Sequence, residues 1–339
     1  MNNQTIISSD TYIHRLMQKV KPSMSYKGDL ADWQPAAKEK LAQLLGMDRF
    51  ESFDPTIHIE YETKIEGATE IRFLLESEEG YFVPCHLLLP DGIENPPVMI
   101  CLQGHTSGMH ISLGRHACER DQYFLFDYNT FCLQAVKEGF AAIALEQRNF
   151  GELSADPEWI TTCHHESGIA TMMGRTTIGE RVWDVRQLIN VLEQNFADRL
   201  NLDCICCMGN SGGGTATAYA GVLEDRLKLV MPSCAMASFK DSIGAMYHCP
   251  CNYVPHIAEY FDMDDIMAMA YPKLFVQVSG DEDPIFPFFA ARAVYEQGSR
   301  AYADQGGSDR CTLVVGHGGH AFYPEEAWPE VRRLLKEEK

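Results

Sequence analysis

The chain has 339 residues, enough for one large domain or two ordinary ones with a substantial core. It carries 48 acidic and 28 basic residues and a formal net charge of -20, which argues against nucleic acid or an anionic membrane as a partner. With 45% hydrophobic and 22% charged residues, the composition is that of a globular protein and excludes a largely disordered chain.

The N-terminal residues lack the basic start and apolar run of a signal peptide, and no apolar stretch of about 18 residues follows. We therefore expect a cytoplasmic protein. Its 12 cysteines are scattered and several lie inside apolar runs, which favours reduced, buried thiols over disulfides. Cys204 and Cys207 form a C-x-x-C, but they fall within a strand-like run, whereas a redox pair normally opens a helix.

The first predicted elements are a helix and an antiparallel meander. Residues 32–45 have apolar residues at helical spacing and end at Gly46, which predicts a helix. Between about 57 and 90, three strand-like runs are separated by Glu66-Gly67 and Glu79-Gly80, as in consecutive hairpins. We expect residues 1–56 to form a helical extension that either covers the site or mediates dimerisation.

The pattern then changes to short apolar runs that alternate with helical segments. In residues 176–195, apolar side chains follow one helical stripe. Short apolar runs of this kind suit parallel strands buried on both faces. The strand-like runs are 97–103, 140–146, 203–209, 227–233, 273–280 and 311–316. These elements predict an α/β fold, a doubly wound, mostly parallel sheet with an antiparallel N-terminal edge, in one domain over 57–339. The long connection 233–272 is expected to cap the carboxyl edge of the sheet.

The segment from Gly209 to Gly213 reads Gly-Asn-Ser-Gly-Gly between a predicted strand and a helix of small residues. This G-x-S-x-G pattern is typical of a nucleophile elbow, in which Ser211 occupies a strained turn and its neighbours must be small. A phosphate-binding loop is the alternative, but the Walker pattern also needs Gly-Lys-Ser/Thr, which is missing here. Ser211 is therefore the candidate nucleophile.

A serine nucleophile needs a general base and a group that orients the base. Asp281, Glu282 and Asp283 follow one predicted strand, and the spacing favours Asp283. His317 and His320 follow the last strand in a glycine-rich loop. We assign His320 as the base, with His317 as the second candidate. The backbone N–H groups of Gly212 and His105 are the candidate oxyanion donors.

At these residues the chain resembles the serine esterases of the α/β-hydrolase superfamily, in particular acetylxylan esterases, cephalosporin C deacetylases and dienelactone-hydrolase-like proteins. The resemblance covers roughly residues 57–337. It rests on Gln103-Gly104-His105, the run from Glu146 to Glu152, the elbow, the run from Gly280 to Pro284, and the run from Gly319 to Phe322. It implies a triad of Ser211, Asp283 and His320, no cofactor, and hydrolysis of small acyl esters, above all acetyl esters, through an acyl-enzyme. A small-molecule ester is the expected substrate, and assembly into a homo-oligomer is left open.

Other polar residues are assigned to the substrate pocket or to its support. The candidates are His248, Cys251, Asn252, Tyr253 and Arg148. His248, Cys249 and Cys251, together with Cys163, His164 and His165, also suggest soft metal ligands, but C-x-C is a poor spacing for structural zinc and we expect no metal. A peptidase or amidase, a lactone hydrolase, or a binding module that kept the fold without activity are the competing functions.

Overall fold

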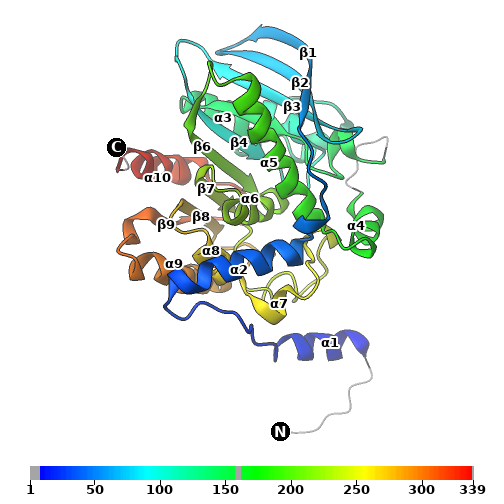
Figure 1. Cartoon of the computed structure of the whole chain (residues 1–339), viewed down its shortest axis with the longest axis vertical. Coiled ribbons are helices and arrows are strands. Elements are labelled where there is room, and N and C mark those ends of the chain that lie inside the picture. Colours follow the sequence, from blue (N-terminus) through cyan, green and yellow to red (C-terminus); the bar gives the residue numbers. More distant parts are fainter. Residues whose placement is uncertain (1–7, 157–161, 338–339) are drawn as a thin grey trace.

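The computed structural model describes residues 8–156 and 162–337. Within these residues, nine strands form a single mixed sheet in the order β1-β2-β3-β5-β4-β6-β7-β8-β9 (Figure 1). The predicted α/β-hydrolase sheet is thereby confirmed. The strands are β1 (Thr56–Ile65), β2 (Ala68–Glu78), β3 (Tyr81–Pro90), β4 (Pro97–Leu102), β5 (Ala141–Leu145), β6 (Asn201–Asn210), β7 (Leu227–Ser233), β8 (Leu274–Gly280) and β9 (Cys311–Gly316).

The sheet has an antiparallel edge and a parallel centre, as the two sequence patterns predict. β1, β2 and β3 form a meander, and β3 pairs antiparallel with β5. The meander turns at Gly67 and Gly80, whose φ angles of 75° and 74° favour glycine. From β5 to β9 all pairings are parallel. β5 and β8 are buried along their whole length, which explains their continuous apolar sequences.

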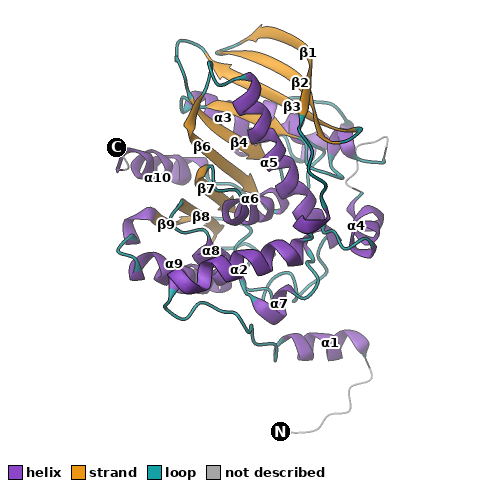
Figure 2. Cartoon of the chain, viewed as in Figure 1, coloured by secondary structure: helices purple, strands orange, loops and turns teal. Residues whose placement is uncertain are grey.

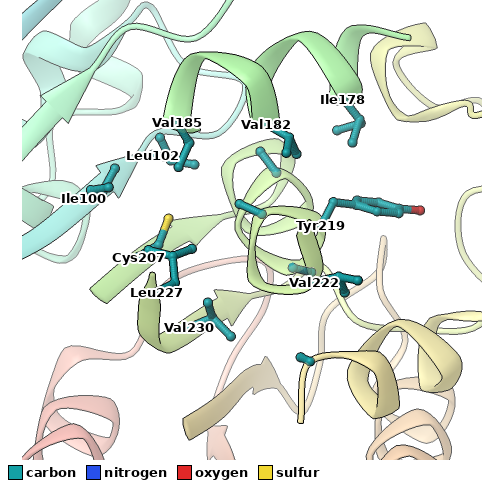
Figure 3. Close-up of a cluster of buried hydrophobic side chains, with 14 of the residues drawn as sticks. Ile100, Leu102, Ile178, Val182, Val185, Cys207, Tyr219, Val222, Leu227 and Val230 are labelled. Carbon is teal, nitrogen blue, oxygen red and sulfur yellow. The ribbon is translucent and has the colours of Figure 1, made fainter. Parts of the chain in front are cut away.

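Helices cover both faces of the sheet (Figure 2). One apolar cluster joins the sheet to α2, α5, α6, α8 and α9, and a second joins the opposite face to α3 and α10. Figure 3 shows side chains from α5, α6 and strands β4, β6 and β7 meeting in the first cluster. The helices are α1 (Ser9–Met17), α2 (Leu30–Leu45), α3 (Phe131–Lys137), α4 (Cys163–Met172), α5 (Thr177–Asn195), α6 (Gly212–Leu223), α7 (Ile257–Tyr260), α8 (Met263–Met269), α9 (Phe288–Asp304) and α10 (Pro324–Glu337).

The N-terminal extension is divided between the main core and a peripheral helix. α2 places Ala37, Leu41 and Leu45 in the first apolar cluster, so it belongs to the same core as the sheet. It ends at Gly46 with φ 75°, where an added Cβ would lie 2.3 Å from the carbonyl oxygen of Gly174. α1 has no buried residue and lies apart from the sheet (Figure 1). Residue 56 therefore does not separate two cores.

The connection 233–272 is only partly the expected cap. Its second half contains α8, where Met263, Ile266 and Met267 are fully buried. α8 packs on α6 and α9 within the first apolar cluster, because its apolar residues repeat at helical spacing. Only the first half of the connection reaches the carboxyl edge of the sheet. In the described ranges, no helix has the length and apolar character needed to cross a membrane.

Candidate active site

Ser211 occupies the sharp turn between β6 and α6. Its φ of 55° and ψ of -121° lie in a region that residues other than glycine rarely adopt. The backbone holds it there, because the N–H of Ser211 donates to the carbonyl of Ser233 at 2.8 Å and its carbonyl accepts from the N–H of Thr215 at 2.8 Å. The turn therefore places the Ser211 side chain at the carboxyl edge of the sheet, where it lines a cavity.

The two glycines around this turn are sterically required. A Cβ added at Gly213 would lie 2.1 Å from the carbonyl oxygen of Leu102, which belongs to the neighbouring strand β4. A Cβ added at Gly209 would lie 2.4 Å from the backbone of Gly213. Because both obstacles are backbone atoms of packed elements, neither can move aside cheaply. The spacing of the G-x-S-x-G motif thus follows from the close approach of β4, β6 and α6.

Asp283 and His320 follow β8 and β9 at the same edge of the sheet. The Nδ1 atom of His320 lies 2.8 Å from Oδ2 of Asp283, whose side chain is 1% exposed. The other carboxylate oxygen accepts backbone N–H groups of Ile285 and Phe286 at 2.8 and 3.0 Å. Burial acts to raise the pKa of Asp283, but the hydrogen bond and charge of His320 and these two N–H groups outweigh it and hold the pKa below its ordinary value.

The contacts of the His320 ring determine which nitrogen is available for proton transfer. Because Nδ1 faces a carboxylate, the neutral ring carries its proton there and keeps a lone pair on Nε2. Phe286 stacks on the ring at 5.8 Å between centroids, which fixes its plane. Nε2 is buried and has no hydrogen-bond partner among the described residues, the hydroxyl of Ser211 included. His320 and Ser211 line the same cavity. In enzymes without substrate, catalytic hydrogen bonds are often long and shorten only in the complex.

A second histidine–aspartate pair lies nearby at the surface. His317 Nδ1 is 2.8 Å from Asp281 Oδ2, the same distance as in the buried pair. The His317 side chain, however, is 93% exposed, against 19% for His320, and it does not line the cavity. Burial and access to the cavity therefore distinguish two pairs that the sequence places at equivalent positions.

The cavity in front of Ser211 has a volume of about 570 Å³. Its walls come from the carboxyl end of β6 and from the segments that follow β4 to β9, as is usual for ligand sites in open α/β sheets. The described lining residues are Gln103, Gly104, His105, Thr106, Tyr123, Phe124, Tyr128, Asn129, Cys163, His164, Asn210, Ser211, Met246, Tyr247, His248, Cys249, Ile285 and His320.

The two residues predicted to donate to the oxyanion both lie close to the nucleophile. Gly212 is the first residue of α6, where backbone N–H groups have no partner within the helix. The loop after β4 packs against the elbow, since a Cβ added at Gly104 would lie 3.0 Å from the Ser211 Cβ. His105, the next residue, lines the cavity. The amide of Gln147 donates to the carbonyl of Gln103 and thereby ties this loop to the segment after β5.

Of the five residues predicted to line or support the pocket, one lines it. His248 is in the cavity wall, and Asn252 lies buried behind it with its amide 3.2 Å from the His248 ring. Burial, together with the nearby His105 and His320, lowers the pKa of His248 to about 4, so its ring is neutral at pH 7. Cys251 is also buried behind the wall. Tyr253 lines a separate small pocket under α1.

The prediction that Arg148 lines the pocket is wrong. Its guanidinium makes two 2.8 Å hydrogen bonds to Asp184 and one to Glu78, and it lies over the ring of Tyr81. These partners are on α5 and in the antiparallel edge, away from the cavity. Since its donors are engaged there, Arg148 braces the fold.

Several lining residues were not anticipated from sequence. The aromatic side chains Tyr123, Phe124, Tyr128 and Tyr247 come from long loops without periodicity. The sequence offers no signal for which residues of these loops face inward. Loop conformation depends on contacts with the rest of the molecule, so a local pattern cannot supply this information.

Comparison with known proteins establishes the family. The sequence model of the Abhydrolase family matches residues 1–227 of the chain. The chain belongs to the Abhydrolase family. It is also 22% identical over 293 residues to the Bacillus subtilis (strain 168) protein named "Putative hydrolase YtaP", covering 84% of this chain and 92% of that protein. The resemblance to α/β-hydrolases is thus confirmed, and the chain is a hydrolase.

Solved structures share the fold of this abhydrolase. The structure described as "a putative acetyl xylan esterase" from Bacteroides fragilis NCTC 9343 has a TM-score of 0.83 at 17% identity and covers 99% of this chain and 97% of its own. A glucuronoyl esterase from Solibacter usitatus has a TM-score of 0.68 at 12% identity, covering 90% of this chain and 91% of its own. At such identities the likeness establishes the fold alone.

A buried carboxyl group in this abhydrolase joins the loop after β4 to the loop after β5. Glu146 accepts the backbone N–H of Met109 at 3.1 and 3.2 Å and that of Glu152 at 3.3 Å. Its side chain has almost no exposure, and burial raises its pKa to about 8 in spite of these hydrogen bonds. The carboxyl group is therefore largely protonated at neutral pH.

Glu146 should make the stability of the protein depend on pH. Folding raises the pKa of this group, so its stabilising contribution is fully present below the ordinary glutamate value and is lost as the pH rises through about 8. Between about pH 5 and about pH 9, we expect the melting temperature of the wild type to fall more than that of Glu146→Gln. Thermal unfolding of both proteins across this range measures the difference, and parallel pH profiles would contradict the assignment.

Proposed function

We propose that this abhydrolase is a serine carboxylic-ester hydrolase that removes small acyl groups, above all acetyl groups, from carbohydrates. One observation carries the proposal. The buried Asp283–His320 pair leaves an unpartnered ring nitrogen, and His320 shares a cavity with the strained Ser211. A nucleophile, a base and a group that orients the base are the components that acyl transfer needs.

The proposed reaction begins when the Ser211 hydroxyl attacks the ester carbonyl and passes its proton to Nε2 of His320. Asp283 stabilises the imidazolium ion that forms, and the backbone N–H groups of Gly212 and His105 hold the oxyanion. Collapse of the tetrahedral intermediate expels the alcohol, which takes the proton from His320. Water, deprotonated by His320, then attacks the acyl-enzyme. When this second tetrahedral intermediate collapses, His320 returns the proton to the Ser211 oxygen and the carboxylic acid is released.

The residues that line the cavity favour an uncharged substrate that contains a ring. None of its described lining residues is Lys or Arg, the side chains that proteins use to bind anionic groups. Tyr123 and Tyr247 are 67% and 76% exposed, so their rings offer flat apolar surfaces for one side of a sugar. Asn129 and Thr106 add polar groups nearby. The names of the structural neighbours, an acetyl xylan esterase and a glucuronoyl esterase, point to the same class of compounds.

The test compares wild type and Ser211→Ala on 4-nitrophenyl acetate, butyrate and octanoate, on acetylated xylo-oligosaccharides, and on a glucuronate methyl ester. We expect acetate release and activity confined to short acyl groups. In Ser211→Ala, kcat should fall by about 10⁴-fold or more. Full activity in this variant would remove Ser211 as the nucleophile. Cleavage of a 4-nitroanilide in place of the esters would favour an amidase, and cleavage of the uronate ester alone would exclude the deacetylase.

A further inference from the structure

Three cysteines and a histidine from three distant segments meet at the cavity wall, where His105, Cys163 and Cys249 line the cavity and Cys251 lies behind them. Cys163 begins α4, Cys249 and Cys251 lie in the connection after β7, and His105 lies in the loop after β4. The three Sγ atoms and a ring nitrogen of His105 all lie within 4.8 Å of one another. The His105 Nε2 to Cys251 Sγ distance is 3.2 Å, and the two Sγ atoms of Cys249 and Cys251 are 3.3 Å apart.

These distances match the dimensions of a tetrahedral metal site. Zinc bonds of about 2.3 Å to sulfur and about 2.0 Å to nitrogen place neighbouring ligand atoms about 3.5 to 3.8 Å apart. The His105–Cys251 and Cys249–Cys251 separations are slightly shorter than this, and no two of the four atoms are more than 4.8 Å apart, so small rotations of the side chains would bring all four atoms to one ion. Three cysteines and one histidine are a common donor set of structural zinc.

The charge around the cluster supplies an independent argument. Arg181 of α5 is fully buried, and its Nε and Nη1 atoms have no hydrogen-bond partner among the described residues. Its Nη2 atom lies 3.7 Å from Cys163 Sγ and donates a hydrogen bond to the carbonyl of Arg148 at 3.0 Å. A buried cation requires a nearby negative charge. Neutral thiols do not provide one.

A zinc complex would provide this charge. Three thiolates and a neutral imidazole around Zn²⁺ carry one net negative charge, which the guanidinium of Arg181 balances. Such a pairing between a metal centre and a neighbouring charged group is typical of the surroundings of metal sites. Two of the four ligands, Cys163 and Cys251, are buried, and His105 and Cys249 are partly buried.

We propose that Cys163, Cys249, Cys251 and His105 bind one Zn²⁺ ion in a closed structural site. Four protein ligands leave no position for water, so the ion does not take part in ester hydrolysis. Its effect is mechanical, since it joins the loop that carries His105 to α4 and to the connection after β7. A Cβ at Gly212 would lie 2.8 Å from the His105 ring, so the ion would hold this ring directly beside the elbow. The site does not depend on the proposed ester substrate.

The metal content of the protein tests this site. The full chain is purified in reductant without a chelating tag from zinc-supplemented medium, and its zinc is measured by mass spectrometry. We expect close to one zinc per chain in wild type and in Cys118→Ser, and loss of the zinc in Cys163→Ser. Cys118 is a matched control because it is partly buried and bonded to Asp121, outside the cluster. Wild type without zinc, or a Cys163→Ser variant that retains it, would overturn the proposal.

A second measurement keeps the test valid if Cys163→Ser does not fold. Wild type depleted of zinc and loaded with Co²⁺ should show the strong visible absorption of a tetrahedral cobalt–thiolate complex, and added Zn²⁺ should bleach it. Cobalt bound without thiolates gives only a faint spectrum, which would contradict the site. A further result would also overturn the proposal. Two of the cluster cysteines would be found joined in a disulfide, and the protein would take up no zinc after that disulfide is reduced.

Discussion

Replacement of His320 by alanine should lower kcat on 4-nitrophenyl acetate by about 10⁴-fold or more, whereas His317→Ala should change it by less than about twofold. Both histidines lie 2.8 Å from an aspartate at the carboxyl edge of the sheet. Only His320 is partly buried and lines the cavity with Ser211, so only its loss removes the base that activates the hydroxyl.

The experiment is steady-state kinetics of both variants, with circular dichroism to verify their folding. Asp281→Asn and Asp283→Asn repeat the comparison at the carboxylates, and only Asp283→Asn should be strongly impaired, because it loses the group that orients the imidazole. A large loss in His317→Ala together with full activity in His320→Ala would reverse the assignment of the base.

Gly213→Ala should destabilise the protein by about 3 kcal/mol or more and abolish hydrolysis in whatever fraction folds. The added Cβ would lie 2.1 Å from the carbonyl oxygen of Leu102 and 2.6 Å from that of Gln103. Relief of these contacts requires α6 to move away from β4. That movement would displace Ser211 relative to His320.

Gly168→Ala is the matched control for this substitution. Gly168 lies within α4, and an added Cβ would have no atom within 4 Å. Alanine is the better helix former by about 1 kcal/mol, so this variant should be at least as stable as wild type. Chemical denaturation of both variants measures the two effects. Equal stability of Gly213→Ala and wild type would show that the elbow tolerates a side chain at this position.

The strands and the elbow were predictable because their signals are local. A run such as that of β8 is apolar throughout because the strand is buried on both faces, and this is visible in seven consecutive residues. Similarly, glycine is needed at 209 and 213 because β4, β6 and α6 approach closely there, and both glycines fall within five consecutive residues of the chain. The positions of Asp283 and His320 followed from strand order, since parallel strands end at a common edge.

Three features needed the tertiary structure, because each depends on which distant segments pack together. The exposure of His317 and the burial of His320, three residues apart, depend on the neighbouring loops and on Phe286. Arg148 is bonded to Asp184, which lies 36 residues further along the chain, and the sequence alone could not exclude that Arg148 faced the cavity. The cysteine cluster joins positions 105, 163, 249 and 251, whose spacing is poor for zinc when read along the chain. Local patterns report the burial of a residue within its own element, whereas the partners of a side chain are determined by the packing of elements that are remote in sequence.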